Sequence, residues 1–561
     1  MTTLEQAVSG SANPFNILPV AAQTSPRRRT ADDLLLGTQR SDLTFSNDGL
    51  YGNLPVELFK TERNFYAFDA RNVCFLKIDE TLFDVLEMLR GTNADLPTLV
   101  SSLTQHTAER VQAAYQEVLR CQEEGLFTPY NFERAPNHEN SEYERVLSES
   151  MGGLTIFVTT KCNLGCSYCI YGGQYDQHEK LSQVAMSWET IRNAMTFLKE
   201  HSKKSQSIRV DFFGGEPLVN FPMIKRGIEY LKQIVAEDGP EVMVTITSNG
   251  TILSEEILEF LTLHKVFIQF SIDGGADVHD KNRRFKGNGK GSFATILANL
   301  QRIYDHDHEY FRSNTRIKGV ITTETLPDED LEFYRHPLIK LIISEEHFTH
   351  VDEEPHYDLA KDADYFARLE QLRTLLLEMD GLESERDITR RLTPRQAGLY
   401  GLTFGDFFEY QVIGQSKFLN SDAVPFSKGC LTGYQEGAVS SNGDISICLK
   451  SAKGDNFVIG NVNEGQWYYE KMKELNTAFH RDWPGCKSCY LQKVCDLCYE
   501  KLDGQDGSFY SGRNNYCQFN RARFRFIFQA MLSVCERNPK LWNYLERTVE
   551  QSLGKSSTPC F

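Results

Sequence analysis

The sequence lacks a long apolar run. None of its hydrophobic stretches approaches the roughly 20 residues that a membrane-spanning helix needs. The first segment, MTTLEQAVSGSANPF, also lacks the basic start and apolar centre of a secretory signal. We therefore expect no membrane partner and a cytoplasmic location.

Basic residues are in the minority. The 561 residues include 60 lysines and arginines against 77 aspartates and glutamates, so the net charge is −17. A protein that binds a nucleic-acid polymer needs a basic face. The composition therefore argues against a nucleic-acid partner.

Cysteines are plentiful for a chain without an export signal. A reducing compartment disfavours structural disulfides, so clustered cysteines indicate metal ligands or catalytic thiols. Four of the 14 cysteines are isolated in the sequence: Cys74, Cys121, Cys535 and Cys560. We expect the first three to be small buried hydrophobic residues and Cys560 to be a free thiol in the tail. The other ten form three groups: Cys162, Cys166 and Cys169; Cys430 and Cys448; and Cys486, Cys489, Cys495, Cys498 and Cys517.

The N-terminal part of the chain has two different compositions. Residues 1–50 are rich in Ser, Thr, Asn and Gly, which predicts a disordered tail. Residues 51–135 contain a hairpin pattern, NFYAFDARNVCFLKID, and three helical patterns. A hairpin with three short helices suggests a winged helix, and the excess of acidic residues in it makes DNA an improbable ligand. A polar linker follows at 136–153.

Strand and helix patterns alternate from Leu154 onward. The expected strands are 154–160, 207–213, 241–247, 266–272 and 315–322, with helices between them. This alternation predicts an α/β fold with a parallel sheet, either open or closed into a barrel, over 154–330. The chemistry of such barrels lies where the strands end. A helical bridging region (331–424), a cysteine-rich domain (425–520) and C-terminal helices with a tail (521–561) should follow.

The stretch KCNLGCSYCI places Cys162, Cys166 and Cys169 at C-x3-C-x2-C spacing, directly after the first expected strand. Zinc would need a fourth ligand, or water with help from a histidine or carboxylate, and the next histidine is His178. A [4Fe–4S] cluster takes four ligands. Three thiolates would leave one iron open to a small chelating molecule.

This motif resembles that of radical S-adenosylmethionine (SAM) enzymes. The resemblance implies a partial (β/α)6 barrel of the TIM type, a [4Fe–4S] cluster on the three cysteines and SAM on the open iron. In that family, cleavage of SAM yields a 5′-deoxyadenosyl radical that abstracts hydrogen from a substrate.

The same resemblance implies SAM contacts at the strand ends. The motifs there are GGEP, TSNG and SIDGG, and an arginine follows the last of them. GGEP could alone be a simple turn, and Asp273 could instead cap the next segment. The implied SAM-binding residues are Tyr168, Gly214, Gly215, Glu216, Pro217, Ser248, Asn249, Ser271, Asp273 and Arg283.

The C-terminal cysteines resemble the SPASM extension, which holds two auxiliary iron–sulfur clusters. The resemblance implies Cys430, Cys448 and Cys498 as ligands of the first cluster, and Cys486, Cys489, Cys495 and Cys517 as ligands of the second. The chain departs from the SPASM pattern in two ways. Two residues, not three, separate Cys495 from Cys498, and no further cysteine lies between Cys430 and Cys448. The first cluster could therefore be open, be smaller or take Asp496. A pair of zinc knuckles is the alternative.

Two features separate the possible activities. Sulfatase maturases carry an aspartate base where this chain has Leu449, and they lack a domain like 51–135. That domain resembles the PqqD-like recognition elements of peptide maturases, which hold a leader peptide as an added strand.

We therefore expect a maturase of a ribosomally made precursor peptide, supplied with electrons by a flavodoxin or ferredoxin-type reductant. An intramolecular thioether crosslink is favoured. Carbon–carbon or carbon–oxygen crosslinking, epimerisation and a sulfatase-maturase-like activity are alternatives. A non-catalytic electron carrier and a zinc-bound scaffold are alternatives of other classes.

Overall fold

The computed structural model describes most of the chain after residue 53. The described residues are 54–70, 74–92, 94–127, 133–134, 140–169, 171, 184–235, 239–321, 333, 335–342, 348–350, 363–384, 387, 390–391, 423–424, 437–449, 457–480, 489–491, 495, 497 and 511–541. The expected tail and the cysteines Cys430, Cys486, Cys498 and Cys560 lie outside them.

The expected α/β sheet is present. Its five predicted strands are β5 (Gly153–Thr159), β6 (Ser207–Gly214), β7 (Glu241–Ser248), β8 (Phe267–Ser271) and β9 (Thr315–Ile321). They lie parallel in sequence order, and β10 (Phe348–His350) adds a sixth parallel strand beside β9. The parallel sheet thus extends past residue 330. This extension was not predicted, because a strand of three residues leaves no readable pattern in the sequence.

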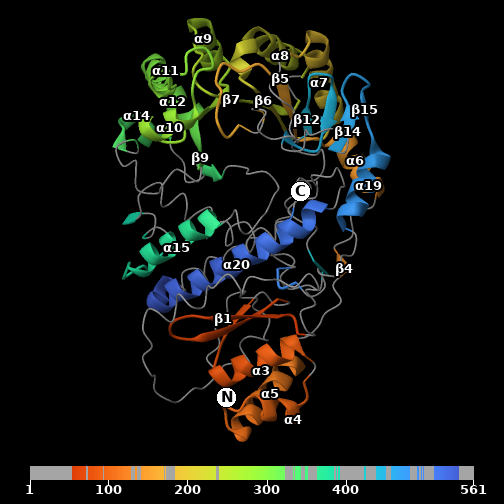
Figure 1. The fold of residues 1–561 in the computed structure, drawn as a ribbon. Coiled ribbons are helices and arrows are strands. Elements are labelled where there is room, and N and C mark those ends of the chain that lie inside the picture. Colours follow the sequence, from red (N-terminus) through yellow and green to blue (C-terminus); the bar gives the residue numbers. More distant parts are fainter. Residues whose placement is uncertain are drawn as a thin grey trace.

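Helices cover one face of this sheet (Figure 1). They are α7 (Trp188–His201), α8 (Phe221–Ile234), α9 (Glu255–Leu263), α10 (Ala276–Asn282), α11 (Phe293–His306), α12 (His308–Asn314) and α14 (Pro337–Ile342). Alternate residues of β6 are fully buried, and Ile208, Val210 and Phe212 share one apolar core with Ile191 of α7 and Ile224 of α8. The residues between them are half-buried, so the polar side chains of Ser207, Arg209 and Asp211 lie on the opposite face of this strand, together with Phe213.

The sheet continues into the C-terminal part of the chain. Strand β12 (Gly437–Val439) pairs parallel with β5, and the antiparallel strands β13 (Asp444–Ser446), β14 (Val458–Asn461) and β15 (Gln466–Trp467) follow. Helix α19 (Tyr469–His480) comes next. Strand β5 therefore joins the two cysteine-containing parts of the chain in one sheet, which among the described residues has ten strands and is open between β10 and β15.

The N-terminal unit contains the expected hairpin, β2 (Phe65–Asp69) and β3 (Cys74–Ile78), and three helices, α3 (Glu80–Gly91), α4 (Leu96–Ser102) and α5 (Ala108–Glu123). A third strand, β1 (Val56–Lys60), was not expected from the sequence. The charge of Glu57 interrupts its apolar pattern. Whether the unit acts as a winged-helix recognition domain stays a prediction.

A long helix, α20 (Ser511–Arg537), begins ten residues before the helix pair expected from residue 521 and inside the expected cysteine-rich domain. Residues 539–541 are helical again after a break at Asn538, and the positions after 541 lie outside the described residues, so the second helix of the pair stays a prediction. It crosses between the barrel and the N-terminal unit, beside α15 (Ala363–Leu377) (Figure 1). Phe528 packs at 5.0–5.8 Å between ring centroids against Phe59, Phe68 and Phe75 of the N-terminal sheet. That sheet is therefore covered on one face by its own helices and on the other by α20.

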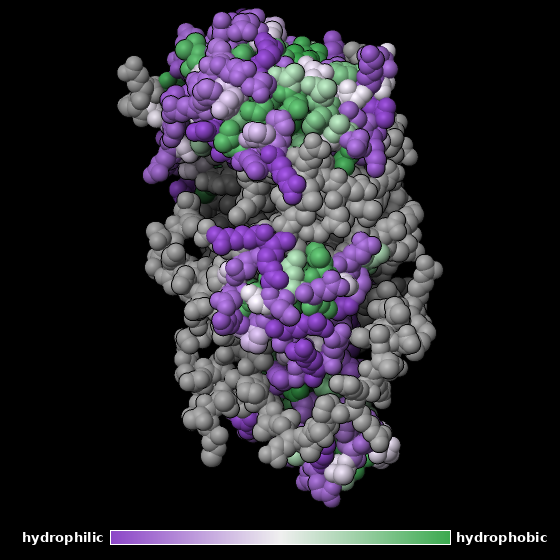
Figure 2. Space-filling view, turned by 90° about the vertical axis from the view of Figure 1, so that its left-hand side faces the viewer, coloured by the Kyte–Doolittle hydropathy of each residue, from purple (hydrophilic) through white to green (hydrophobic). Residues whose placement is uncertain are grey.

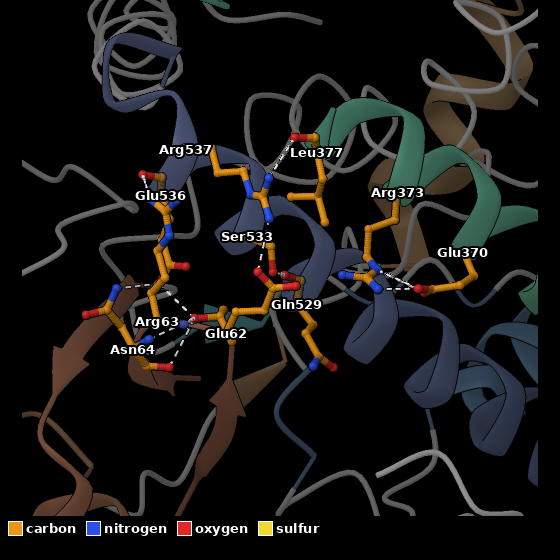
Figure 3. A network of polar contacts seen from close by, with 11 residues as sticks. Glu62, Arg63, Asn64, Glu370, Arg373, Leu377, Gln529, Ser533, Glu536 and Arg537 are labelled. Carbon is orange, nitrogen blue, oxygen red and sulfur yellow. Dashed lines mark hydrogen bonds and ion pairs between the residues drawn. The ribbon is translucent and has the colours of Figure 1, made fainter. Parts of the chain in front are cut away.

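Polar contacts fix the same junction (Figure 3). One carboxylate oxygen of Glu536 accepts hydrogen bonds from Thr61 (2.8 Å), Asn64 (2.6 Å) and Tyr66 (2.7 Å). Arg537 pairs with Glu62 at 3.0 Å. The turn between β1 and β2 is thereby attached to the end of α20.

Three further short elements are described. They are α6 (Asn140–Glu149), which precedes β5, and the strands β4 (Glu133–Arg134) and β11 (Ala423–Val424), which pair in parallel.

The barrel end of the face in Figure 2 is mostly hydrophilic, with a smaller hydrophobic area among the polar residues. No helix within the described ranges is long and apolar enough to cross a membrane.

We predict that Glu57→Ala weakens the junction between the N-terminal unit and α20. Glu57 is 2% exposed and pairs with Arg90 at 3.0 Å and with Arg525 at 2.8 Å. Breaking a fully buried pair costs about 3–5 kcal/mol. Because Arg525 is 50% exposed, we expect the free energy of unfolding to fall by about 2 kcal/mol. Urea titration followed by near-UV circular dichroism measures the change. Glu256→Ala, which breaks an exposed pair with Lys225, is the control, and an equal shift in both variants would contradict the prediction.

Candidate functional site

The three cysteines of the first group lie in the loop of residues 161–169, which follows β5 and is called the cysteine loop below. Each of these cysteines is half-buried. Burial raises the pKa of Cys162 and of Cys166 to about 11 and also raises the pKa of Cys169. The charges of Arg283 and Lys286 act in the opposite direction on these thiols.

The cysteine loop is held by a distant segment, residues 282–286, which follows α10. The amide of Gly165 donates to the carbonyl of Arg284 (2.8 Å), and the amide of Lys286 donates to the carbonyl of Asn163 (2.9 Å). A short antiparallel bridge, Leu164 with Phe285, therefore joins the loop to the connection between α10 and α11. Arg283 was expected at the site from the sequence, whereas this pairing was not expected.

The donor set fits an iron–sulfur cluster. Three half-buried thiols lie beside two cationic side chains, which would offset the negative charge of thiolates bound to iron. In a [4Fe–4S] cluster each thiolate binds a different iron, so the three sulfur atoms need not converge on one ion. Within the described residues, no group of three or more His, Cys, Asp or Glu side chains converges on a single metal ion.

The turn after β6 packs directly on the start of the cysteine loop. Gly214 has φ +136°, and a Cβ atom there would lie 2.1 Å from the carbonyl oxygen of Thr159, so glycine is required. The amides of Gly215 and Glu216 donate to the carbonyls of Thr159 (2.9 Å) and Lys161 (2.8 Å). These two amides are used within the protein, and the contact of Gly214 and Gly215 with SAM stays a prediction. The adjoining Pro217 is buried at the start of a short 3-10 helix, Pro217–Asn220.

Glu216 joins the turn after β6 to the turn after β7. It is fully buried and accepts hydrogen bonds from Ser248 Oγ (2.9 Å) and from the amide of Asn249 (2.6 Å). Burial raises its pKa to about 7, although the hydrogen bonds favour the charged form. Glu216 and the buried Ser248 thus position the site, and their contact with SAM stays a prediction.

Asn249 connects the turn after β7 to the cysteine loop. Its Nδ2 lies 2.8 Å from Asn163 Oδ1 and 3.8 Å from Cys162 Sγ, while its Oδ1 accepts from the amide of Thr251. Asn249, which was predicted to bind SAM, therefore contacts Cys162 of the cysteine loop.

Asp273, Arg283 and Tyr168 form a buried network beside the loop. The carboxylate of Asp273 accepts hydrogen bonds from Tyr168 Oη and from Arg283 Nε (3.0 Å), and the guanidinium carbon of Arg283 lies 5.3 Å from the Tyr168 ring centroid. Burial alone would raise the pKa of Asp273, but the charges of Arg283 and His279 hold it below its usual value. The structure thus brings these three predicted residues together. Ser271 lies half-buried at the end of β8, two residues before Asp273.

Two residues of this network were not expected. His279 accepts a hydrogen bond from the amide of Asp273 (3.3 Å), and its Nε2 lies 2.9 Å from Ser292 Oγ. Ser292 in turn donates to the carbonyl of Arg283 (2.9 Å). Burial lowers the pKa of His279 to about 4, so the ring is neutral near neutral pH. The available sequence signal was weak, namely a histidine four positions before Arg283.

An aromatic cluster connects the cysteine loop to the C-terminal part of the chain. Tyr171 packs against Phe157 and Phe213 at 5.7 Å and 6.4 Å between ring centroids, and Cys169 and Leu449 lie against this cluster. Tyr171 also donates a hydrogen bond to the carbonyl of Leu449 (3.0 Å). The residue after Cys448 therefore lies beside the cysteine loop.

Four predicted auxiliary-cluster ligands, Cys448, Cys489, Cys495 and Cys517, lie within the described residues. Cys489 and Cys495 pack against the main apolar core. Tyr490 donates to the carbonyl of Arg521 (2.6 Å), and Arg521 Nε donates to the carbonyl of Cys517 (3.2 Å). Tyr490 thus links the segment after Cys489 to the part of α20 that carries Cys517, while the ligand roles stay predictions.

The region that contains the cysteine loop and the strand-end turns, residues 156–333, matches the family model of the radical SAM superfamily. These residues form a radical SAM domain.

This radical SAM domain has curated relatives. The chain is 23% identical over 274 residues to the radical SAM cyclopropyl synthase TigE of Paramaledivibacter caminithermalis, with 46% of this chain and 54% of TigE covered. It is 25% identical over 394 residues to a cysteine-type anaerobic sulfatase-maturating enzyme of Clostridium perfringens (strain 13 / Type A), with 66% of this chain and 95% of that enzyme covered. The match thus spans about half the length of TigE.

Among solved structures, "Native anSMEcpe with bound AdoMet" aligns with a TM-score of 0.48 and 18% identity, covering 68% of this chain and 99% of that chain.

We predict that Glu216 lowers the stability of the folded protein as pH rises. Its pKa is raised from 4.5 to about 7 on folding, so the folded state binds the proton more tightly. The free energy of unfolding should then fall by about 3 kcal/mol between pH 4.5 and pH 7. His279, with its lowered pKa, acts in the opposite direction in this window, so the test compares variants.

The measurement is urea unfolding of the wild type and Glu216→Gln at several pH values. The difference in unfolding free energy between them should change in favour of the variant as pH rises from 4.5 to 7. A difference that is independent of pH would contradict the prediction.

Proposed function

We propose that the chain is a radical SAM enzyme that modifies a ribosomally made precursor peptide. The observation that carries this proposal is the convergence of the turns after β6 and β7 and the segment after α10 on one loop with three cysteines. When bound there, a [4Fe–4S] cluster with SAM supplies a 5′-deoxyadenosyl radical that abstracts hydrogen from the substrate.

The chain's own residues would hold and orient these groups. Cys162, Cys166 and Cys169 would bind three irons. Arg283, whose Nε is held by Asp273, would direct its terminal nitrogens to the carboxylate of SAM. Tyr168, fixed by its hydrogen bond to the same aspartate, would lie near the adenine.

We favour an intramolecular crosslink as the product, and a thioether above carbon–carbon or carbon–oxygen bonds or epimerisation. Leu449 supports this choice over a sulfatase-maturase-like activity. It lies beside Tyr171 and Cys169 in an apolar cluster, where an aspartate would serve as a base in the sulfatase maturases. An apolar side chain cannot accept a proton there.

The C-terminal cysteines would hold two auxiliary iron–sulfur clusters that accept the electron released when the new bond forms. The hydrogen bond between Tyr171 and the carbonyl of Leu449 supports this arrangement, because it keeps Cys448 close to the cysteine loop. A non-catalytic electron carrier would have no use for the strand-end residues that surround that loop.

The N-terminal unit would hold the leader of the precursor peptide as an added strand. Helix α20 contacts the edge strand β1, where Gln529 donates to the carbonyl of Lys60 (2.9 Å). Among the described strands, β3 pairs only with β2. We therefore assign the leader to the edge of β3.

The first test of this proposal is anaerobic incubation of the reduced, iron-loaded chain with SAM and each short cysteine-containing peptide that genes next to its own encode. We expect a loss of two hydrogens per modified site and residues that resist fragmentation in the mass spectrum. Cys166→Ala should abolish the change, whereas Cys121→Ala, a buried cysteine of the N-terminal core, should retain it. If the peptide mass stays constant while 5′-deoxyadenosine forms, this peptide is not a crosslinking substrate, and either another substrate or epimerisation follows.

The auxiliary clusters can be tested through Tyr490. We predict that Tyr490→Phe lowers iron content by up to about four irons per chain, because the lost hydrogen bond to Arg521 releases the segment after Cys489 from α20. Tyr310→Phe is a matched control: Tyr310 is equally buried (4% exposed) and donates to the carbonyl of Val266 at the same 2.6 Å. Equal iron content in the two variants would contradict the prediction.

A further inference from the structure

Residues 281–290, called the basic turn below, form a concentrated positive region in an acidic chain. The stretch contains five basic residues and no acidic residue, whereas the whole chain has a net charge of −17. Four of them, Lys281, Arg284, Lys286 and Lys290, are exposed, and Arg283 is buried against Asp273.

The basic turn is part of the wall around the cysteine loop. Its backbone bonds to the loop on both sides of Phe285, through Arg284 and Lys286. The side chain of Lys286 lies over Gly165, since a Cβ atom on that glycine would be 3.3 Å from Lys286 Cγ. Gly165 and Ser167 are the exposed residues of the loop. The basic turn therefore borders the part of the cysteine loop that faces solvent.

Few negative charges in the adjoining segments oppose this region. Asp273 is buried and paired with Arg283, and Asp280 is half-buried with its carboxylate against the amide of Phe293 (2.9 Å). Asp277, at the start of α10, is exposed. The four exposed cations thus outnumber the exposed acidic groups of this segment, and they belong to the turn whose backbone pairs with the cysteine loop.

We propose that the basic turn binds an acidic one-electron donor protein that reduces the cluster at the cysteine loop. The proposal rests on the proposed function, since it requires that cluster. One electron passes from the reduced donor to the oxidised [4Fe–4S]2+ cluster and gives [4Fe–4S]+; the donor is oxidised by one electron, and no bond is formed or broken.

The charge pattern suits this class of partner. Electron-transfer proteins form transient complexes with small interfaces, and complementary charge raises the rate at which the partners associate. Such steering increases association rates by about 10–1,000-fold and falls steeply with ionic strength. An acidic donor would be repelled by the chain as a whole and attracted at the exposed side of the cysteine loop.

The test uses the full-length, iron-loaded chain with the charge-reversal variant Lys281→Glu/Lys290→Glu. Lys281 lies in the last turn of α10. The control is Lys199→Glu/Lys203→Glu, which changes the net charge equally. Lys199 lies in the last turn of α7, which leads to the start of β6. It is therefore at the amino ends of the parallel strands, whereas the cysteine loop follows the carboxyl end of β5. Both lysines of each pair are exposed.

Stopped-flow absorbance gives the second-order rate constant for cluster reduction by a reduced flavodoxin and, separately, by a reduced ferredoxin. At about 0.05 M salt we expect the basic-turn variant to react at least about tenfold more slowly than the wild type, and the control within about twofold. At 1 M salt, where the Debye length is about 3 Å, the difference should disappear. Equal rates in the two variants would overturn the proposal.

Dithionite separates this proposal from the proposed function. If the wild type reduced by dithionite forms no 5′-deoxyadenosine from SAM, the proposed function fails. If it does, and donor rates are unchanged in the basic-turn variant, the docking proposal alone fails. Loss of peptide modification under dithionite, with donor rates unchanged, would instead assign the basic turn to an acidic peptide.

Discussion

The site depends on backbone hydrogen bonds that reach the cysteine loop from other parts of the sheet. The loop has almost no regular structure of its own, so the positions of its thiols are set by its partners. The turn after β6 bonds to its first residues, and the segment after α10 bonds to its middle. Because each partner follows the end of a different strand or helix of the domain, the positions of the cysteines depend on the folded domain as a whole.

Two buried carboxylates hold the surrounding turns by different means. Glu216 has hydrogen-bond donors around it, and burial raises its pKa. Asp273 faces Arg283, whose charge outweighs the effect of burial and lowers the pKa. The first carboxylate ties two turns to each other, and the second fixes an arginine and a tyrosine beside the thiols. Two acidic residues therefore differ in their ionisation. Glu216 can take up a proton near neutral pH, whereas Asp273 stays charged.

The sequence predicted the parts of this site that depend on local pattern. The cysteine spacing and the five strands with their end motifs can be read from residues close together along the chain. The pairing of the cysteine loop with residues 282–286 could not be read, because Ser167 and Asn282, which hydrogen-bond across it, are 115 positions apart. Strand β1 was missed because Glu57 is compensated by Arg525, 468 positions away. The length of helix α20 was not expected, because its buried residues face several partners at once, which removes the amphipathic period.

In the function that we propose, the cysteine loop holds a [4Fe–4S] cluster with one iron open to SAM. The most direct measurement is the electron paramagnetic resonance spectrum of the anaerobically reduced, iron-loaded chain, recorded with and without SAM. Addition of SAM should change the spectrum of the wild type and leave unchanged that of a variant in which Cys162, Cys166 and Cys169 are all alanine. A fully iron-loaded wild type whose spectrum is the same with and without SAM would contradict the claim.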